Sequence, residues 1–532
     1  MNSVVSIFEN IMNLAADTIK VPDVVEQTFA IYPESVLECL DYFERTLDDG
    51  CIKNKQPQLS LLFNEAFTRL RYKLDNGESE AKNILDQAHH MLKTRLADMG
   101  IEKKMIITCA LHDSKLPTPE LDYVENADSL AVLKSIPNIA PQLPALLDQI
   151  RREGGLSSPF QLYDFLIAQI QIQPMEIQCA LINELIVAKN APIQDVGVFM
   201  LLHPKKLIRR MVPLIWLDNF INGKIRISPI SLRRFIVIRN WLPYDEQSAI
   251  DTLIQQIRKT KIMPAPHPSS KITRLISSIV DGAGVQCFLF ETKAKNQRTI
   301  AGFLVKNAIG IREPFVIHKA HAEEFSHMLK QYTLPAKSVS TTYTSKLVAH
   351  FISIGQQENH IPEPIFLEIA ELFGVQQWLP QPIDPMTEIN RIKEQENLDT
   401  NDPILIEQAL KYSAVWTETA DFAQSWFETG ECVNSIIIEA VETHSKMKAH
   451  ALDTLPKITT RALMKDDLLN KWIFILTRML LWHRSKSIKG EEWKYFLVIA
   501  EKLLQGYPVE DIPLMQEITK RSVAHSVQWQ RI

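Results

Sequence analysis

Glycine is scarce in this chain of 532 residues, which contains only 16 copies, or about 3% against the roughly 7% that is usual in proteins. Proline is present in ordinary number, at 29 copies. Hairpin-rich β proteins need glycine in their tight turns, whereas a helix accepts proline at its first position. The composition therefore predicts a mainly α protein whose helices are separated by joints that contain proline.

Paired cysteines, an apolar core of the signal-peptide type near the first residue and long apolar runs are also missing from the sequence. The six cysteines form no C-x-x-C pair, which is the spacing of many zinc sites and redox dithiols. Glu9 and Asp17 stand where a signal peptide needs its apolar core, and no run approaches the roughly 18 apolar residues of a membrane span. We therefore expect a cytoplasmic protein with no membrane span and no cofactor. A protein exported without a cleavable signal would show the same features.

The familiar catalytic signatures are absent as well. The sequence contains no P-loop, no nucleophile elbow and no H-E-x-x-H motif. Gly282 and Gly284 form a G-x-G, but Cys287 stands where a dinucleotide fingerprint needs its third glycine, so a turn is the simpler interpretation. Ser445 and Lys448 form an S-x-x-K, a pattern that chance produces in many chains of this length. No catalytic residue is predicted.

Four residues of metal-ligand type recur at spacings of three: His318, His321, Glu324 and His327. A helix turns 100° per residue, so each step of three loses 60° and the first and last of these side chains face opposite sides. Adjacent pairs alone share a face. Histidines at a junction between a strand and a helix are the preferred interpretation, and no metal site is predicted.

Residues 1–155 are expected to form an N-terminal helical region. Over residues 59–74, apolar side chains recur at spacings of three and four and charged side chains fall between them. The same pattern recurs over residues 79–99. Both segments therefore predict amphipathic helices.

Residues 156–279 are expected to form helical hairpins stacked in sequence order. The prolines at positions 159, 174, 192, 204, 229 and 243 stand 12 to 25 residues apart, and Ser158 and Ser228 precede two of them as candidate helix N-caps. The segments His203–Arg210 and Ser228–Arg234 each place a polar residue and proline before an aliphatic residue beside arginine. They resemble the second helix of HEAT repeats. This resemblance, over roughly a fifth of the chain, implies a HEAT-like α-solenoid and carries over no functional residue.

Residues 280–318 break the helical pattern. Val285–Glu291 and Arg298–Lys306 are rich in residues that favour strands, Lys293–Gln297 has turn chemistry, and a third such run ends at His318. A small β-hairpin or three-stranded meander is predicted, with a buried helix over residues 298–307 as the alternative. Beyond it we expect a helical segment (319–380), a polar, proline-rich linker (381–402) and a C-terminal helical domain (403–532) that begins with a helix over residues 403–429.

Positive charge is concentrated in the middle of the chain. Between His203 and Arg312 there are 19 Lys or Arg and 6 Asp or Glu, a net charge of +13, whereas the whole chain has a net charge of −5. A solenoid would gather such side chains on one concave surface. The cations that we predict to bind a partner are Lys205, Lys206, Arg209, Arg210, Arg258, Lys259, Lys261, Lys293, Lys295 and Arg298.

The function that these observations favour is a non-enzymatic scaffold or adaptor whose basic middle segment binds an acidic protein surface. Binding of nucleic acid phosphates by the same cations is an alternative. Pairing of many of these cations with carboxylates of the same molecule is another. Arg239 is expected to point inward and to have a structural role. A second alternative is an enzyme near the β segment that uses Asp281, Glu291 or His318 without a recognisable motif. The sequence predicts no oligomeric state.

Overall fold

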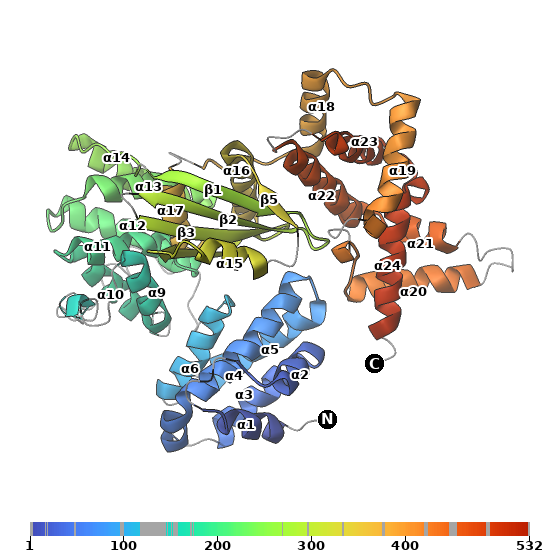
Figure 1. Ribbon diagram of the computed structural model, residues 1–532. Coiled ribbons are helices and arrows are strands. Elements are labelled where there is room, and N and C mark those ends of the chain that lie inside the picture. Colours follow the sequence, from blue (N-terminus) through green and yellow to red (C-terminus); the bar gives the residue numbers. More distant parts are fainter. Residues whose placement is uncertain are drawn as a thin grey trace. The chain divides into compact units, whose positions relative to one another are not determined.

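The protein is described by a computed structural model, which divides into two compact units. Unit 1 comprises residues 1–232 and 249–263, and unit 2 comprises residues 233–248 and 264–532. The residues that the structure describes are 4–15, 18, 20–46, 49–95, 101–117, 145, 147–149, 152, 158–170, 173, 175–268, 270–294, 297–331, 335–374, 378–419, 424–445, 455–485 and 490–529. The predicted class is confirmed: the fold is mainly α, with one small antiparallel sheet and a C-terminal helical domain (Figure 1).

The N-terminal helices of unit 1 pack around one long helix, α4. These helices are α1 (Val4–Met12), α2 (Asp23–Ile31), α3 (Ser35–Thr46), α4 (Asp49–Asp75), α5 (Ser79–Arg95) and α6 (Ile101–Asp113). Helix α4 contacts the other five. The apolar positions of the predicted periodicity, among them Leu62, Phe63 and Phe67, are fully buried. Non-helical dihedral angles at Lys55, shortly before Pro57, divide α4 at a kink.

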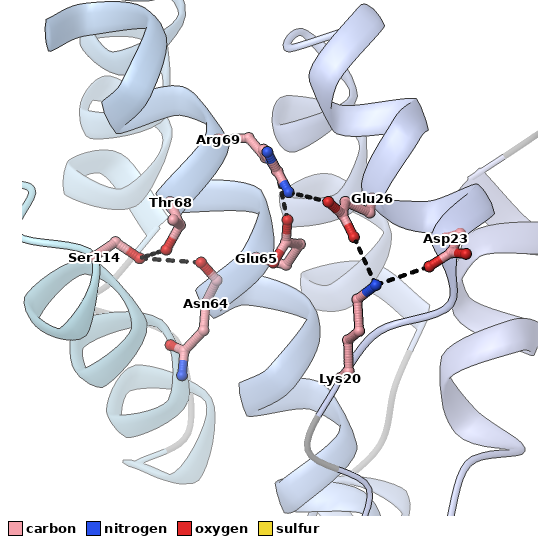
Figure 2. A network of polar contacts seen from close by, with 8 residues as sticks. All are labelled: Lys20, Asp23, Glu26, Asn64, Glu65, Thr68, Arg69 and Ser114. Carbon is pink, nitrogen blue, oxygen red and sulfur yellow. Dashed lines mark hydrogen bonds and ion pairs between the residues drawn. The ribbon is translucent and has the colours of Figure 1, made fainter. Parts of the chain in front are cut away.

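An ion-pair network connects α2 to α4 (Figure 2). Arg69 of α4 donates to Glu65 one turn earlier, with Nε 2.6 Å from Oε1, and also pairs with Glu26 of α2. Glu26 lies 3.4 Å from the ammonium group of Lys20, which is itself paired with Asp23 at 2.9 Å. Arg69 thus bridges two carboxylates that would otherwise repel each other at the contact between the helices.

Hydroxyl groups connect the end of α6 to α4. Ser114, directly after α6, lies with its Oγ 3.1 Å from the carbonyl oxygen of Asn64 and 3.2 Å from Oγ1 of Thr68 (Figure 2). Ser114 is buried, so these bonds satisfy a hydroxyl that has left water.

The remaining helices of unit 1 begin where the sequence places prolines and caps. They are α9 (Pro159–Ile170), α10 (Met175–Val187), α11 (Ala191–Phe199), η1 (Met200–Leu202), α12 (Lys206–Ile221), the first turn of α13 (Pro229–Trp241) and most of α14 (Gln247–Lys259). Ser158 Oγ accepts from the Phe160 N–H, and Ser228 Oγ accepts from the Ser231 N–H. Helix α10 contacts both α11 and α12. The HEAT-like organisation of these helices stays a prediction.

The sheet of unit 2 contains five antiparallel strands in the order β4-β3-β2-β1-β5. The strands are β1 (Lys271–Ser278), β2 (Val285–Ala294), β3 (Gln297–Lys306), β4 (Gly310–His318) and β5 (Ala336–Ser338). The meander of β2, β3 and β4 confirms the prediction, so the alternative of a helix over residues 298–307 is wrong. Strands β1 and β5 lie in segments that we expected to be helical, which means that the sheet begins before residue 280 and recruits an additional strand after His318.

Helices cover both faces of this sheet (Figure 1). Phe325 of α15 (Glu324–Gln331) packs on Leu289 and Ile300, which point to one face. On the other face, Phe303 contacts Phe366 of α17 (Pro364–Phe373) edge-on, with ring centroids 5.3 Å apart. Helix α16 (Thr341–Gln357) contacts the same sheet along β3 and β4. The sheet is therefore the buried layer between helices, as its apolar strands require.

The C-terminal part of unit 2 consists of α18 (Pro385–Glu396), α19 (Pro403–Thr419), α20 (Glu431–Ser445), α21 (Leu455–Leu463), α22 (Asp466–Arg484), α23 (Glu492–Leu504), η4 (Val509–Asp511) and α24 (Pro513–Trp529). Helix α18 lies inside the predicted linker 381–402, which is therefore wrong as a structureless joint: Ile389 and Ile392 are buried, and Asp384 caps the helix. Helix α19 is described as far as Thr419, and residues 426–429, which we expected to belong to it, are not helical. In the part of the chain that the structure describes, no helix is long and apolar enough to cross a membrane.

A fully buried arginine joins α22 to the sheet. Arg478 donates from Nη1 to the Gly284 carbonyl oxygen at 2.8 Å and to Asn307 Oδ1 at 2.9 Å, and from Nη2 to Gln286 Oε1 at 3.0 Å. Its guanidinium group lies over the ring of Phe351, 4.9 Å from the centroid. Burial lowers the pKa of Arg478 to about 10, which leaves the group charged at neutral pH. One cation thus satisfies three acceptors from the sheet and its turns.

The turn that Arg478 contacts contains the G-x-G of the sequence. The Asp281 carboxylate accepts from the Val285 N–H at 2.7 Å, and Gly284 has a φ of +76° that favours glycine. A Cβ atom at Gly282 would lie 2.0 Å from the carbonyl oxygen of Ser425. Both glycines therefore serve a tight turn packed against another segment, as the sequence predicted, and not a phosphate loop.

We predict that Arg478→Met lowers the free energy of unfolding by about 2–4 kcal/mol, because three acceptors of the sheet and its turns each lose a charged donor. Urea denaturation followed by tryptophan fluorescence measures this change. The control Arg391→Met removes a partly exposed pair with Glu388 and is expected to cost less than about 1 kcal/mol. Equal stability of Arg478→Met and the wild type would contradict a structural role for this buried cation.

Candidate partner-binding surfaces

The four predicted cations at the start of α12 do not share one exposed face. Arg209 is 1% exposed, and its Nη1 donates to the carbonyl oxygens of His203 at 2.9 Å and Pro204 at 2.8 Å. Arg210 is exposed, whereas Lys205 and Lys206 are half-buried. Arg209 as a partner-binding residue is therefore a wrong prediction. Lys205 has extended dihedral angles and precedes the helix, so the helical spacing that placed Lys205 and Arg209 together does not apply.

The second cluster of unit 1 lies at the end of α14. Arg258, Lys259 and Lys261 are all exposed there. Lys261 follows the helix with a φ of +61°. Cations suit this position because the helix dipole places partial negative charge at its C-terminal end. These three residues therefore have a local electrostatic role in addition to any contact with a partner.

The third cluster lies at one end of the sheet in unit 2. Lys271 of β1 pairs with Lys293 of β2, and Lys293 pairs with Arg298 of β3. Directly paired residues of antiparallel strands project to the same face. Lys271, Lys293 and Arg298, here called the cation row, therefore stand side by side on the face that α15 also covers. Lys295, predicted with them, lies outside the described residues.

A buried carboxylate compensates part of the row. Glu291 is 4% exposed and lies 3.5 Å from Nη1 of Arg298, while its Oε1 accepts from the Thr273 hydroxyl at 2.8 Å. Lys271 and Lys293 are exposed and form no ion pair with any described residue. Like charges directly opposite each other destabilise a sheet. The row therefore maintains a local excess of positive charge at a cost in stability.

The three clusters do not belong to one unit. The cations near residues 205–210 and 258–261 lie in unit 1, whereas the cation row lies in unit 2. Each cluster is a separate candidate surface. The predicted common concave wall remains a prediction.

Part of the positive charge of the middle segment is used internally. Arg233 and Arg234 are buried and share Glu371 of α17: Arg233 Nη2 and Arg234 Nε lie 2.8 and 2.9 Å from its Oε1. Burial opposes ionisation of Glu371, but the hydrogen bonds and charges of the two arginines hold its pKa below the usual value. Arg239, which we expected to point inward, is only half-buried. On this helix the buried arginines are therefore Arg233 and Arg234, whereas the sequence predicted Arg239.

The histidine cluster has structural contacts. His318, at the end of β4, lies with Nε2 3.0 Å from Glu368 Oε1 of α17. The Glu324 carboxylate accepts from the backbone N–H of His321 at the start of α15. Among the residues described, no group of three His, Cys, Asp or Glu side chains is placed to hold a metal ion.

The sheet separates the three residues that we considered for an enzyme site. Asp281 precedes β2, where burial raises the pKa of its carboxyl group, whereas Glu291 lies near the other end of that strand. His318 pairs with Thr299, and Thr299 pairs with Thr292, the residue after Glu291. Since successive residues of a strand point to opposite faces, His318 and Glu291 lie on different faces of the sheet. The fold does not bring these three side chains into one site.

Comparisons with known proteins find similarity to two Y4lR domains and to a relative that is described as uncharacterized. Residues 174–261 match the model of the Y4lR second domain, and residues 386–527 match that of the Y4lR C-terminal helical domain. The chain is also similar to the uncharacterized protein y4lR of Sinorhizobium fredii, with 21% identity over 481 residues that cover 87% of each chain. No solved structure matches the chain. The two cation clusters of unit 1 lie within the segment similar to the Y4lR second domain, whereas the cation row lies between the two matched segments.

We predict that Arg209→Met lowers the free energy of unfolding by about 1–3 kcal/mol, because the carbonyl oxygens of His203 and Pro204 lose a charged donor. Its neighbour Arg210, which is exposed, provides the matched control: Arg210→Met is expected to change stability by no more than about 0.5 kcal/mol. Thermal and urea unfolding of both variants measure the difference. Similar losses of stability in the two variants would contradict a structural role that belongs to the buried Arg209 and not to the exposed Arg210.

We predict that the contact between His318 and Glu368 stabilises the protein more at acidic than at alkaline pH. The hydrogen bond to Glu368 raises the pKa of His318, so its contribution is complete below the unfolded pKa of about 6.5 and is lost as the pH rises through the folded pKa. His318→Gln should therefore lower the urea midpoint at pH 5.5 and change it little at pH 8.5. Since His318 is well exposed, we expect an effect below about 1 kcal/mol.

The variant Glu368→Gln provides the control for this pH dependence. It removes the carboxylate and should abolish the difference between the histidine and glutamine forms at both pH values. A stability difference that is the same at pH 5.5 and pH 8.5 would contradict an ionic contact.

Proposed function

We propose that this protein is a non-enzymatic scaffold or adaptor that binds an acidic surface of a macromolecular partner. The observation that carries the proposal is the cation row of Lys271, Lys293 and Arg298, held in register across three strands. The exposed cations at the end of α14 and the exposed Arg210 supply further positive surface in unit 1. A cytoplasmic location remains part of the proposal.

The electrostatic cost of the row supports a binding role. Exposed cations that only keep a protein soluble are usually interspersed with carboxylates, but Lys271 and Lys293 stand directly opposite each other. An anionic partner relieves this repulsion when it binds, so energy stored in the free protein is recovered in the complex. The chain as a whole has a net charge of −5, so the cation row is a local exception to the sign of the overall charge.

The size of the row favours a protein partner over a nucleic acid. A protein that binds nucleic acid commonly neutralises about 6–10 phosphates, whereas the row contains three cations, one of which faces Glu291. Few carboxylates are needed to complement a surface of this size. Nucleic acid binding remains the alternative, and it predicts a much steeper dependence of affinity on salt.

We predict that the wild-type protein binds fluorescent poly-L-glutamate at low salt and that Lys271→Glu with Lys293→Glu weakens this binding at least about tenfold, or about 1.4 kcal/mol. Fluorescence anisotropy measures both affinities. The control exchanges two exposed lysines elsewhere in unit 2, Lys411→Glu and Lys465→Glu, which changes the net charge equally. Thermal unfolding should show that the row variant remains folded; no gain in stability is expected, because its two glutamates again stand directly opposite each other.

Equal weakening by the row variant and its control would mean that net charge alone governs binding, which would contradict the proposal. Tighter binding of single-stranded DNA than of poly-L-glutamate, with a steep loss of affinity at higher salt, would favour the nucleic acid alternative instead.

A further inference from the structure

The outer edge of β1 is only half paired. Strand β5 pairs with Ile276, Ser277 and Ser278, and the Val339 N–H donates to the Leu275 carbonyl oxygen at 3.1 Å. From Lys271 to Arg274, no described strand lies on that edge of the sheet. Lys271 and Thr273 are exposed there. On this edge, about half of β1 therefore has backbone N–H and C=O groups that form no hydrogen bonds with a described strand.

This segment is already held in strand conformation. The register with β2 shifts between Ile272 and Arg274, which leaves Thr273 as the extra residue of a bulge. The Thr273 hydroxyl donates to both the carbonyl oxygen and the carboxylate of Glu291. Arg274 lies over the ring of Phe325, 4.0 Å from the centroid. An incoming strand would therefore find an ordered edge, and little conformational entropy of this edge would be lost on binding.

The two edges of the sheet differ in this respect. On the opposite edge, β4 contains Pro314, which has no N–H to donate, and Glu313 with a φ of +49°, within a second register shift. Such features prevent a strand from being added. Both edges contain a bulge, so the difference between them lies in Pro314 and the positive φ of Glu313, neither of which has a counterpart in the open part of β1.

The charges on the open edge select its occupant. Lysine on an edge strand commonly prevents self-association, and here a second copy of the edge would bring Lys271 and Arg274 towards like charges. The same two cations, with Lys293 on the next strand, complement carboxylates. The edge therefore discourages neutral strands and copies of itself and favours an acidic one.

We propose that an extended acidic segment of a partner protein adds a sixth strand to the sheet along Lys271–Arg274. This inference rests on the proposed function and specifies how the partner is recognised. Backbone hydrogen bonds along β1 supply affinity, and acidic side chains at alternate positions of the segment lie over the cation row. Alternation is required because every second side chain of a strand points to the same face.

The first test uses a fluorescent octapeptide of alternating Glu and Val, together with two forms that are N-methylated at one or the other set of alternate amides. Both methylated forms retain every charge, but each loses the donors of one peptide edge. Because only one edge faces β1, we expect one methylated form to bind at least about tenfold more weakly than the unmethylated peptide and the other to bind almost equally. Fluorescence anisotropy with the full chain measures the three affinities.

The second test locates the peptide by hydrogen–deuterium exchange. We expect the unmethylated peptide to slow exchange of the amides of Lys271–Arg274 and to leave the amides of β4 unchanged. The variant Lys271→Glu should reduce both the affinity and this protection, whereas Lys411→Glu should reduce neither.

The outcomes separate this inference from the proposed function. Equal affinities of the two methylated peptides, or protection elsewhere than β1, would overturn strand addition, while binding of poly-L-glutamate at the cation row would still support an acidic partner. If neither the octapeptide nor poly-L-glutamate binds, both proposals fail. Protection of Lys271–Arg274 that depends on protein concentration without peptide would assign the edge to a second copy of the chain and would also overturn the inference.

Discussion

The interaction on which unit 2 depends is the burial of Arg478 against neutral acceptors. A guanidinium group removed from water needs most of its donors satisfied, and Gly284, Gln286 and Asn307 provide the oxygens at one end of β2 and β3. Their positions hold the two turns at that end of the sheet. Strands β2 and β3 then remain in unbroken register from Val285 and Lys306 to the far end of the hairpin. Lys293 and Arg298 are aligned by the same continuous register, close to the turn that joins the two strands.

The positive charge of the middle segment serves two purposes that differ by residue type. The arginines that turn inward, Arg209, Arg233 and Arg234, each use the planar fork of donors to satisfy carbonyl or carboxylate oxygens. The exposed cations of the sheet edge include two lysines, whose compact charge stays hydrated on a flexible stem. A net charge of +13 over the segment is therefore a sum of cations that build the fold and cations that remain available to a partner.

The sheet combines an open edge with charges that restrict its use. Strand β4 is closed to addition by Pro314 and by the positive φ of Glu313, and β5 covers the C-terminal half of β1. The remaining open edge is the short segment Lys271–Arg274 of β1, which lies beside the cation row. Affinity from backbone hydrogen bonds is independent of sequence, so selectivity has to come from the neighbouring side chains. In this geometry the selective element is electrostatic.

The sequence by itself determined the mainly α class, the meander of β2, β3 and β4, and the turn at Gly282 and Gly284, because scarce glycine, alternating β-formers and turn residues act over short distances. Local signals were also present for α18, in Asp384 and Pro385, although the polar composition of the segment favoured a linker. Only the tertiary structure decided that Arg209 is buried and that Lys271 stands beside Lys293. The first depends on where α12 begins. The second depends on the pairing of β1 with β2, and the sequence pattern did not indicate a strand at β1.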